Sequence, residues 1–322
     1  MGYLSNGEWL TDGAMPSSSD GRFVRKASSF RNWVTEDGAP GPTGDGGFKA
    51  EPGRYHLIVS HACPWAHRTI IFRKLKKLEE IVTLNAVEPL MLENGWTLSE
   101  PDPVTGAETA WQIYVKADPN YSGRATVPIL WDRKSRTIVS NESAEIIRMF
   151  NSAFDAWGDS SLDFHPKELR QEIDGINTLI YETVNNGVYR AGFARTQDAY
   201  DEAVTALFDT LDFLEDRLSR KRYLTGERLT EADWRLFTTL VRFDAVYNGH
   251  FKCNIRRIAD YPNLFGYLRE LYQVPGVAET VDFAAIKQHY YGSHESLNPT
   301  RIVPAGPDID LTLPHQRQKL AA

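Results

Sequence analysis

The residue in this sequence best suited to chemistry is a cysteine followed by a proline. Pro64 favours the first position of a helix, because its missing N–H needs no partner there. Cys63, directly before that helix, faces unpaired backbone N–H groups and the positive end of the helix dipole. Both favour the thiolate, which is the nucleophilic form. The sequence therefore predicts a nucleophilic thiol at Cys63, with a small buried cysteine as the alternative.

Cys63 has no second thiol beside it. The position of the partner in a Cys-x-x-Cys redox motif holds Ala66. Any disulfide formed by Cys63 must then be opened by the thiol of another molecule. Cys253 takes that role only if the fold brings it close, and we expect it to be a structural cysteine.

Two histidines flank the cysteine, His61 and His67. A metal site needs further ligands at workable spacing, and no Cys/His cluster supplies them, so we predict no metal. A histidine acting as general base near Cys63 is an alternative. We expect His67, on the helix, to face solvent or to pack locally.

The elements around Cys63 predict an α/β unit. A strand is expected at 54–59, a helix from Pro64 to about residue 78, and a second strand at 81–87. A strand, a helix and a strand in this order form a βαβ unit with parallel strands. Further expected elements are a loop at 88–110, a short helix around 111–116, strands at 126–132 and 137–140, and a helix with Asn141 as N-cap and Glu142 in its first turn that reaches Phe150.

The second half of the sequence predicts helices only. They are expected at about 167–186, 197–219, 230–246, 263–272 and 276–289. Thr230 and Asp233 form a capping-box pattern, with Leu229 and Trp234 as a hydrophobic staple, which is a structural device without chemistry. We predict an N-terminal extension at 1–50, an α/β domain at 51–155, a helical domain at 165–295 and an extended tail at 296–322.

Composition excludes several classes of protein. Lys and Arg total 36 against 43 Asp and Glu, a net charge of −7 that gives no general attraction to nucleic acid or anionic membrane. Two cysteines are too few for a disulfide framework, and we find no signal peptide and no run of apolar residues long enough for a membrane span. We expect a cytoplasmic protein without nucleic-acid or membrane partners.

Six segments carry a resemblance to a known family. They are Phe-Arg-Asn-Trp at 30–33, Gly-Ala-Pro-Gly-Pro-Thr-Gly at 38–44, Cys-Pro-Trp-Ala-His-Arg at 63–68, Pro-Leu-Met-Leu-Glu-Asn-Gly-Trp at 89–96, Ser-Asn-Glu-Ser at 140–143 and Asn-Asn-Gly-Val-Tyr at 185–189. Together they resemble the glutathionyl-hydroquinone reductases, also called Xi-class glutathione transferases. The resemblance spans nearly the whole chain. It implies a thioredoxin-like N-terminal domain, an α-helical glutathione-transferase C-terminal domain, and a homodimer.

The resemblance also implies roles for individual residues. Cys63 is implied as the nucleophile and Tyr189 as the proton donor or acceptor. Tyr247 and Tyr290 are implied to lower the pKa of the thiol and to contact the quinol, although the neighbouring Tyr291 could take the place of Tyr290. The residues implied to hold the co-substrate glutathione are Trp96, Arg124, Ala125, Thr126, Val127, Glu142 and Ser143.

Elementary chemistry suits several of these positions. Val127-Pro128 resembles the cis-proline turn of thioredoxin folds, whose backbone pairs with the cysteinyl part of glutathione. Glu142 and Ser143 begin a helix, where backbone N–H groups and a hydroxyl can receive the γ-glutamyl carboxylate. The Glu142 carboxylate can pair with the ammonium group.

The implied reaction is the glutathione-dependent reduction of S-glutathionyl-hydroquinones to hydroquinones. It runs through a mixed disulfide between Cys63 and glutathione and releases oxidised glutathione. One alternative is a cysteine-type glutathione transferase or deglutathionylase that acts on other thioethers or mixed disulfides. Another is a non-catalytic glutathione-binding module, against which the Cys63-Pro64 start argues. The sequence does not identify the physiological quinone.

Overall fold

Four strands form the central sheet of the N-terminal half, in the order β10-β9-β5-β6, in a computed structural model that describes residues 2–11 and 17–320. β5 (Tyr55–Val59) pairs in parallel with β6 (Val82–Ala86) and antiparallel with β9 (Ile129–Asp132). β9 pairs antiparallel with β10 (Thr137–Ser140). β5 is buried along its whole length, as a central strand must be. The βαβ and ββ arrangement confirms the predicted thioredoxin-like fold.

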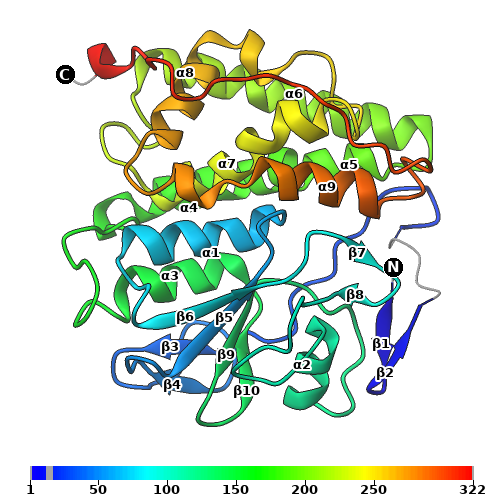
Figure 1. Ribbon diagram of the computed structural model, residues 1–322. Coiled ribbons are helices and arrows are strands. Elements are labelled where there is room, and N and C mark those ends of the chain that lie inside the picture. The colour runs from blue at the N-terminus through cyan, green and yellow to red at the C-terminus, as the bar shows by residue number, and fades with distance from the viewer. Residues whose placement is uncertain (1, 12–16, 321–322) are drawn as a thin grey trace. The chain divides into compact units, whose positions relative to one another are not determined.

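Helices α1 (Pro64–Leu75) and α3 (Ser143–Ser152) lie side by side over one face of this sheet (Figure 1). α2 (Ala110–Ala117) begins at Thr109, whose hydroxyl accepts a hydrogen bond from the Gln112 N–H in a capping box. The predicted end of the first helix at about residue 78 is wrong. The chain leaves α1 and adopts a positive φ of 55° at Lys77.

The segment 88–110 is not all loop, contrary to the prediction. It contains a hairpin of β7 (Met91–Leu92) and β8 (Gly95–Trp96), which pair antiparallel. Strands of this length are too short to show an alternation of apolar and polar residues, so the sequence pattern carried no signal for them.

The N-terminal extension contains short strands that the sequence did not predict. β1 (Tyr3–Ser5) pairs antiparallel with β2 (Glu8–Leu10), and β3 (Trp33–Thr35) pairs in parallel with β4 (Gly47–Lys49). The Gly- and Pro-rich stretch before β4 is a loop, as predicted. It requires glycine because a Cβ at Gly41 would lie 2.1 Å from the Trp33 ring.

Between residue 164 and the end of the described chain the named elements are all helical, as predicted. They are η1 (Lys167–Leu169), α4 (Arg170–Ile180), η2 (Tyr181–Asn185), α5 (Gly187–Gly192), α6 (Gln197–Arg220), α7 (Glu231–Arg242), η3 (Phe243–Tyr247), η4 (Ile258–Asp260), α8 (Pro262–Tyr272), η5 (Ala278–Thr280), α9 (Phe283–Ser293) and η6 (Gln318–Leu320). The single helix predicted at 276–289 is wrong, because η5 and α9 divide it. α5 was not predicted as a separate helix. Among the described residues no helix is both long and apolar enough to cross a membrane.

The predicted capping box at the start of α7 is confirmed. The Asp233 carboxylate accepts a hydrogen bond from the Thr230 N–H at 2.8 Å. The same carboxylate also accepts from the Leu224 N–H at 2.9 Å and from the Tyr267 hydroxyl at 2.8 Å. The cap therefore also ties α7 to α8 and to the preceding loop.

The chain folds into two compact units. Of the described residues, the first unit contains 2–11, 26–163 and 284–289, and the second contains 17–25, 164–283 and 290–320. The first holds the sheet with α1 to α3, and the second holds the helices from α4 to α8. The predicted domain boundaries at 51–155 and 165–295 stay predictions.

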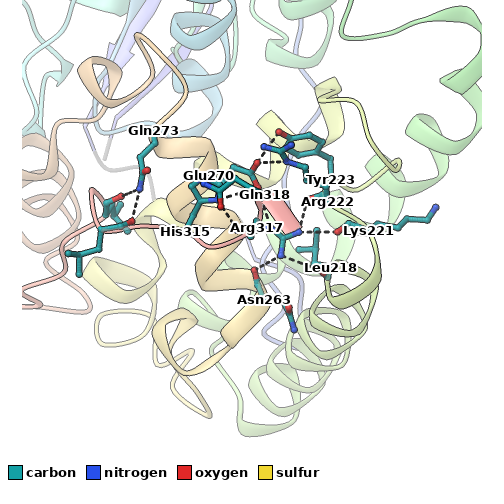
Figure 2. A network of polar contacts seen from close by, with 12 residues as sticks. Leu218, Lys221, Arg222, Tyr223, Asn263, Glu270, Gln273, His315, Arg317 and Gln318 are labelled. Atoms are coloured by element: carbon teal, nitrogen blue, oxygen red, sulfur yellow. Dashed lines mark hydrogen bonds and ion pairs between the residues drawn. The ribbon is translucent and has the colours of Figure 1, made fainter. Parts of the chain in front are cut away.

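The C-terminal tail is extended, as predicted, and a buried arginine fixes its end to the second unit. Arg317 is 3% exposed, and its guanidinium lies 3.2 Å from the Glu270 carboxylate (Figure 2). It also donates to backbone carbonyls at the following residues and distances: Leu218 at 3.1 Å, Lys221 at 2.9 Å, Arg222 at 2.6 Å and Asn263 at 3.3 Å. Most of these carbonyls lie at the C-terminal end of α6, where the helix itself supplies no partner.

Candidate active site

Cys63 is the N-cap of α1 and Pro64 lies in its first turn, as predicted. The Cys63 carbonyl accepts the first helical hydrogen bond, from the His67 N–H at 3.0 Å. The thiol is largely buried, with the residue 9% exposed, and Sγ lies 3.5 Å from the Val127 carbonyl oxygen. The thiol therefore lies at the positive end of a helix and beside the loop that precedes β9.

That loop contains a cis peptide bond between Val127 and Pro128, which confirms the predicted turn. A buried tyrosine of α2 holds the backbone before it. The Tyr114 hydroxyl donates to the Thr126 carbonyl at 2.9 Å and accepts from the Thr126 N–H at 3.2 Å. Burial raises the pKa of Tyr114 to about 12, so this hydroxyl stays protonated and keeps both bonds. Sequence reasoning missed Tyr114, which no motif marks.

The start of α3 differs by one residue from the prediction. Its N-cap is Glu142, whose carboxylate accepts from the Ala144 N–H at 3.0 Å, and not Asn141. Asn141 is buried, and its side chain donates to the Tyr114 hydroxyl at 2.9 Å and accepts from the Phe30 N–H at 3.1 Å. The amide links the extension to α2, which is why it does not cap the helix.

Glu142 and Ser143 have partners from distant parts of the sequence. The second carboxylate oxygen of Glu142 accepts from the Ser28 hydroxyl at 2.9 Å. The Ser143 hydroxyl accepts from the Arg68 guanidinium at 3.4 Å. Arg68 is 1% exposed and lies on α1, five positions after Cys63. A buried positive charge therefore joins the cysteine helix to the start of α3.

Trp96 lies on β8 and is 7% exposed. Its ring stacks on His289 with the centroids 4.7 Å apart, and the His289 ring nitrogen Nδ1 lies 2.9 Å from the Pro89 carbonyl oxygen. The hairpin turn is held from the extension, where the Trp9 indole N–H donates to the Glu93 carbonyl at 3.0 Å. Sequence reasoning missed both Trp9 and His289.

The remaining predicted glutathione residues lie on the loop before the cis-proline. Arg124 and Ala125 are half-buried, and the side chain of Thr126 is exposed. The Arg124 carbonyl accepts from the Tyr121 hydroxyl at 3.4 Å. The first unit thus contains Cys63 and every residue predicted to hold glutathione.

The second unit contains the three predicted tyrosines, which form one hydrogen-bonded cluster. The Tyr290 hydroxyl on α9 lies 2.6 Å from that of Tyr189 on α5 and 2.9 Å from that of Tyr247. Tyr247 and Tyr290 are fully buried, and burial raises the pKa of both well above the usual value, against the opposing charge of Arg242. Both phenols therefore stay neutral, whereas Tyr189 is only half-buried.

Two π-helical turns shape this cluster. Tyr247 ends η3, and η2 immediately precedes the short helix that carries Tyr189. The Asn185 side chain at the end of η2 donates to the Thr239 hydroxyl at 2.7 Å and to the Arg235 carbonyl at 3.1 Å, which fixes the turn against α7. A π turn changes the direction in which the following side chains point, and neither periodicity nor a capping motif predicts one.

The structure also places three further residues named in the sequence analysis. Tyr291 donates to the Ala245 carbonyl at 3.4 Å and packs on His250, so Tyr290 and not Tyr291 joins the cluster. His67 was expected to face solvent or to pack locally, and because it is fully buried the second alternative holds. Cys253 is also fully buried, and burial raises the pKa of its thiol. These properties suit a structural cysteine.

Comparison with known proteins gives a consistent picture. The family model described as the N-terminal domain of glutathione S-transferases matches residues 62–153, and that of the C-terminal domain matches residues 197–270. The chain is 58% identical to the glutathionyl-hydroquinone reductase YqjG of Escherichia coli, over 98% of both chains. It is 54% identical to the glutathionyl-hydroquinone reductase PcpF of Sphingobium chlorophenolicum, over 95% of this chain and 96% of that protein.

Solved structures agree with these relatives. The glutathione-bound structure of YqjG, a glutathione transferase homologue from Escherichia coli, matches with a TM-score of 0.90 and 56% identity, over 98% of this chain and 99% of that one. The Xi-class glutathione transferase of Natrialba magadii matches with a TM-score of 0.92 and 48% identity, over 99% and 98%. The chain therefore belongs to the glutathionyl-hydroquinone reductases, the Xi class of glutathione transferases.

Proposed function

We propose that this protein reduces S-glutathionyl-hydroquinones to hydroquinones and uses glutathione as its co-substrate. The observation that carries the proposal is the thiol of Cys63 at the start of α1, with Ala66 where a second thiol would stand. Such a thiol can attack a glutathione sulfur, but it needs an external thiol to complete the cycle. Membership of a family in which two relatives carry this name supports the same activity.

Glutathione is proposed to bind across the residues of the first unit. The Val127 backbone pairs with the cysteinyl part, and Ser143 with the N–H groups of α3 receives the γ-glutamyl carboxylate. The buried Arg68 beside Ser143 adds positive charge where a carboxylate binds. Glu142 pairs with the ammonium group of glutathione. The remaining contacts are assigned to Trp96, Arg124, Ala125 and Thr126.

In the first step the Cys63 thiolate attacks the sulfur of the aryl thioether. An S–S bond forms, the bond between sulfur and the aromatic carbon breaks, and its electron pair passes to that carbon. Tyr189 gives the carbon a proton, so the hydroquinone leaves and a Cys63–glutathione disulfide remains. A second glutathione thiolate then attacks the glutathione sulfur of this disulfide, which releases oxidised glutathione and the Cys63 thiolate.

The tyrosine cluster can support the proton transfer. If the Tyr189 hydroxyl gives its proton to the substrate, its oxygen can accept a hydrogen bond from the Tyr290 hydroxyl, which in turn accepts one from the Tyr247 hydroxyl. Because Tyr290 and Tyr247 stay neutral, they remain donors when Tyr189 loses its proton. We also propose, as the family implies, that Tyr247 and Tyr290 contact the quinol and lower the pKa of the thiol.

Mass spectrometry tests the half-reaction. Protein exposed to a glutathionyl-hydroquinone in the absence of free glutathione is expected to gain one glutathione on the peptide that contains Cys63, and free glutathione is expected to remove it. The Cys63→Ser variant, treated in the same way, is the matched control and gains none. A peptide that carries the whole conjugate, or no adduct at all, would contradict the mechanism.

Relative rates separate the alternative enzymes. We expect a glutathionyl-menadiol to be a better substrate than either a small mixed disulfide or chlorodinitrobenzene. Preference for the disulfide would point to a deglutathionylase, and preference for chlorodinitrobenzene to a transferase. Retention on glutathione resin without turnover of any thioether would point to a binding module.

Replacing Tyr189 with phenylalanine is expected to lower kcat on the thioether by about a hundredfold, because a carbon leaving group must be protonated. The rate on a mixed disulfide is expected to change little, because a thiolate leaves without a proton. Steady-state kinetics on both substrates measures the difference. Equal losses on the two substrates would remove Tyr189 from the role of proton donor.

Replacing Trp9 with alanine is expected to raise KM for glutathione roughly threefold to tenfold, with kcat little changed. The loss of its hydrogen bond to Glu93 frees the hairpin that carries Trp96. Trp157, which is 43% exposed, provides the matched control, and Trp157→Ala is expected to leave KM unchanged. An unchanged KM in Trp9→Ala would show that the hairpin needs no support from the extension.

We propose, as the family implies, that the protein is a homodimer, and we expect it to be cytoplasmic. Light scattering coupled to gel filtration is expected to give twice the 36.5 kDa of one chain.

A further inference from the structure

Part of the N-terminal extension, residues 17–25, belongs to the helical unit and packs beside Tyr189. The Phe23 ring stacks on the Tyr189 ring with the centroids 6.3 Å apart, and it also contacts Phe193 at 5.7 Å. The Arg195 N–H donates to the Gly21 carbonyl at 3.0 Å, which fixes the backbone of the segment. The extension therefore has a defined place next to the proposed proton donor.

Arg25 ends this segment with its guanidinium against the face of the tyrosine. Its Cζ lies 4.9 Å from the centroid of the Tyr189 ring and 5.3 Å from that of Phe23. Its Nε donates to the side-chain oxygen of Asn186 at 2.6 Å. Asn186 is 5% exposed, and its own carbonyl accepts from the Tyr189 N–H at 3.0 Å. One buried amide residue thus orients both the guanidinium and the helix turn that carries the phenol.

A cation on the face of an aromatic ring is attracted by the electrons of the ring. The attraction grows when the ring carries a negative charge, so the cation favours loss of the phenolic proton. Arginine suits this position because its planar group stacks on a ring while its N–H groups hold a fixed partner. Arg25 meets both conditions through Tyr189 and Asn186.

The other titratable or charged groups named near Tyr189 contact its hydroxyl oxygen, the neighbouring Tyr290 or the ends of its segment. Tyr290 contacts the Tyr189 oxygen, with Tyr247 behind it. The charge of Arg242 acts on Tyr290, and the ring of His294 packs on Tyr290 at 5.5 Å. Glu182 and Arg190 form an exposed ion pair at the ends of the Tyr189 segment. Arg25 is thus the residue by which the extension places a positive charge on the ring itself.

We propose that Arg25 is a positioning residue for the reaction, which holds the Tyr189 ring in place and stabilises the negative charge that Tyr189 carries after giving up its proton. The proposal rests on the proposed function, in which Tyr189 protonates the departing carbon. The N-terminal extension then assists proton donation by Tyr189, in addition to supporting the fold.

Kinetics with charge-altering variants tests the role. Arg25→Gln is expected to lower kcat on the thioether about threefold to tenfold and to move the basic limb of the pH profile up by about half a unit. The mixed-disulfide rate is expected to stay unchanged, and Arg25→Lys to recover part of the loss. Arg22→Gln is the matched control, since Arg22 lies on the same segment but pairs with Asp20 and Glu202. Equal losses on both substrates with an unmoved pH profile would overturn the proposal.

A direct titration separates this proposal from the proposed function. Carbon-13 NMR of ring-labelled tyrosine, with the signal assigned through Tyr189→Phe, follows the phenol without turnover. In Arg25→Gln its midpoint is expected to rise by about half a unit, and in Arg22→Gln to stay in place. An unmoved midpoint in Arg25→Gln, in a protein that turns over the thioether, overturns the role of Arg25. A protein that binds the thioether but never releases hydroquinone overturns the proposed function, even where the midpoint moves.

Discussion

Replacing Cys63 with alanine abolishes the release of hydroquinone from a glutathionyl thioether, with a fall in rate of at least about a thousandfold. No other group at the start of α1 can take the sulfur: Ala66 has none, and Cys253 is fully buried in the second unit. Cys63→Ser leaves little activity, because a serine hydroxyl there is a far weaker nucleophile than a thiolate. Chromatography of released hydroquinone under anaerobic conditions with excess glutathione measures both variants.

Binding and turnover are expected to separate in the alanine variant. The contacts proposed for glutathione come from the Val127 backbone, from Ser143 and from the N–H groups of α3, none of which the substitution removes. Cys63→Ala should therefore still bind glutathione in calorimetry with an affinity within about threefold of the unaltered protein. Loss of binding together with turnover would mean that the substitution disturbs the site, and not the nucleophile alone.

Cys253→Ala is the matched control for the loss of a thiol. The backbone N–H of Cys253 donates to the Tyr247 carbonyl at 3.0 Å, and alanine keeps that bond. Its rate is expected to stay within about twofold of the unaltered protein, because a buried thiol with a raised pKa supplies no thiolate. Full activity in Cys63→Ala, or loss of activity in Cys253→Ala, would show that Cys63 is not the nucleophile.

The features that the sequence predicts well are those that depend on a few neighbouring residues. Pro64 after Cys63 determines where α1 begins, and Thr230 with Asp233 determines where α7 begins; both starts are confirmed. Local chemistry suffices in these cases, because a cap is formed within one helical turn. The ends of helices are less well predicted, as the early end of α1 shows.

The residues that sequence reasoning missed act through contacts between distant parts of the chain. Trp9 and Glu93 are 84 positions apart, and Arg25 and Asn186 are 161 apart. Tyr114 holds Thr126 through a buried hydroxyl, a contact that neither periodicity nor spacing encodes. Such residues hold the site residues in position, and only the folded chain shows which site residue each one contacts.

Replacing Arg317 with methionine is expected to lower the free energy of unfolding by about 3 kcal/mol. The guanidinium supplies donors to four backbone carbonyls and to the Glu270 carboxylate, and methionine offers none (Figure 2). Buried acceptors without a partner cost on the order of 1 to 3 kcal/mol each, less where water can enter. Glu270 keeps the Arg222 guanidinium at 2.6 Å and the Tyr223 hydroxyl at 3.0 Å, so the carbonyls at the end of α6 account for most of the loss.

Arg301→Met is the matched control in the same tail. Arg301 is exposed and lies 3.6 Å from the exposed Glu295, a pair expected to contribute less than about 0.5 kcal/mol. The midpoints of urea unfolding and of thermal unfolding measure both variants. Equal effects of the two substitutions would contradict a specific anchor at Arg317.

The anchor also determines which part of the chain opens first. Arg317 donates to Leu218 in the last turn of α6, to the two residues directly after that helix, and to Asn263 at the start of α8. Its loss is therefore expected to detach the tail before the helices themselves separate. Limited proteolysis of Arg317→Met is therefore expected to cut the tail between residues 296 and 316 faster than in Arg301→Met, while the helices stay intact. Should cutting begin within α6 or α8 instead, the guanidinium stabilises the helices themselves, and the tail depends on them.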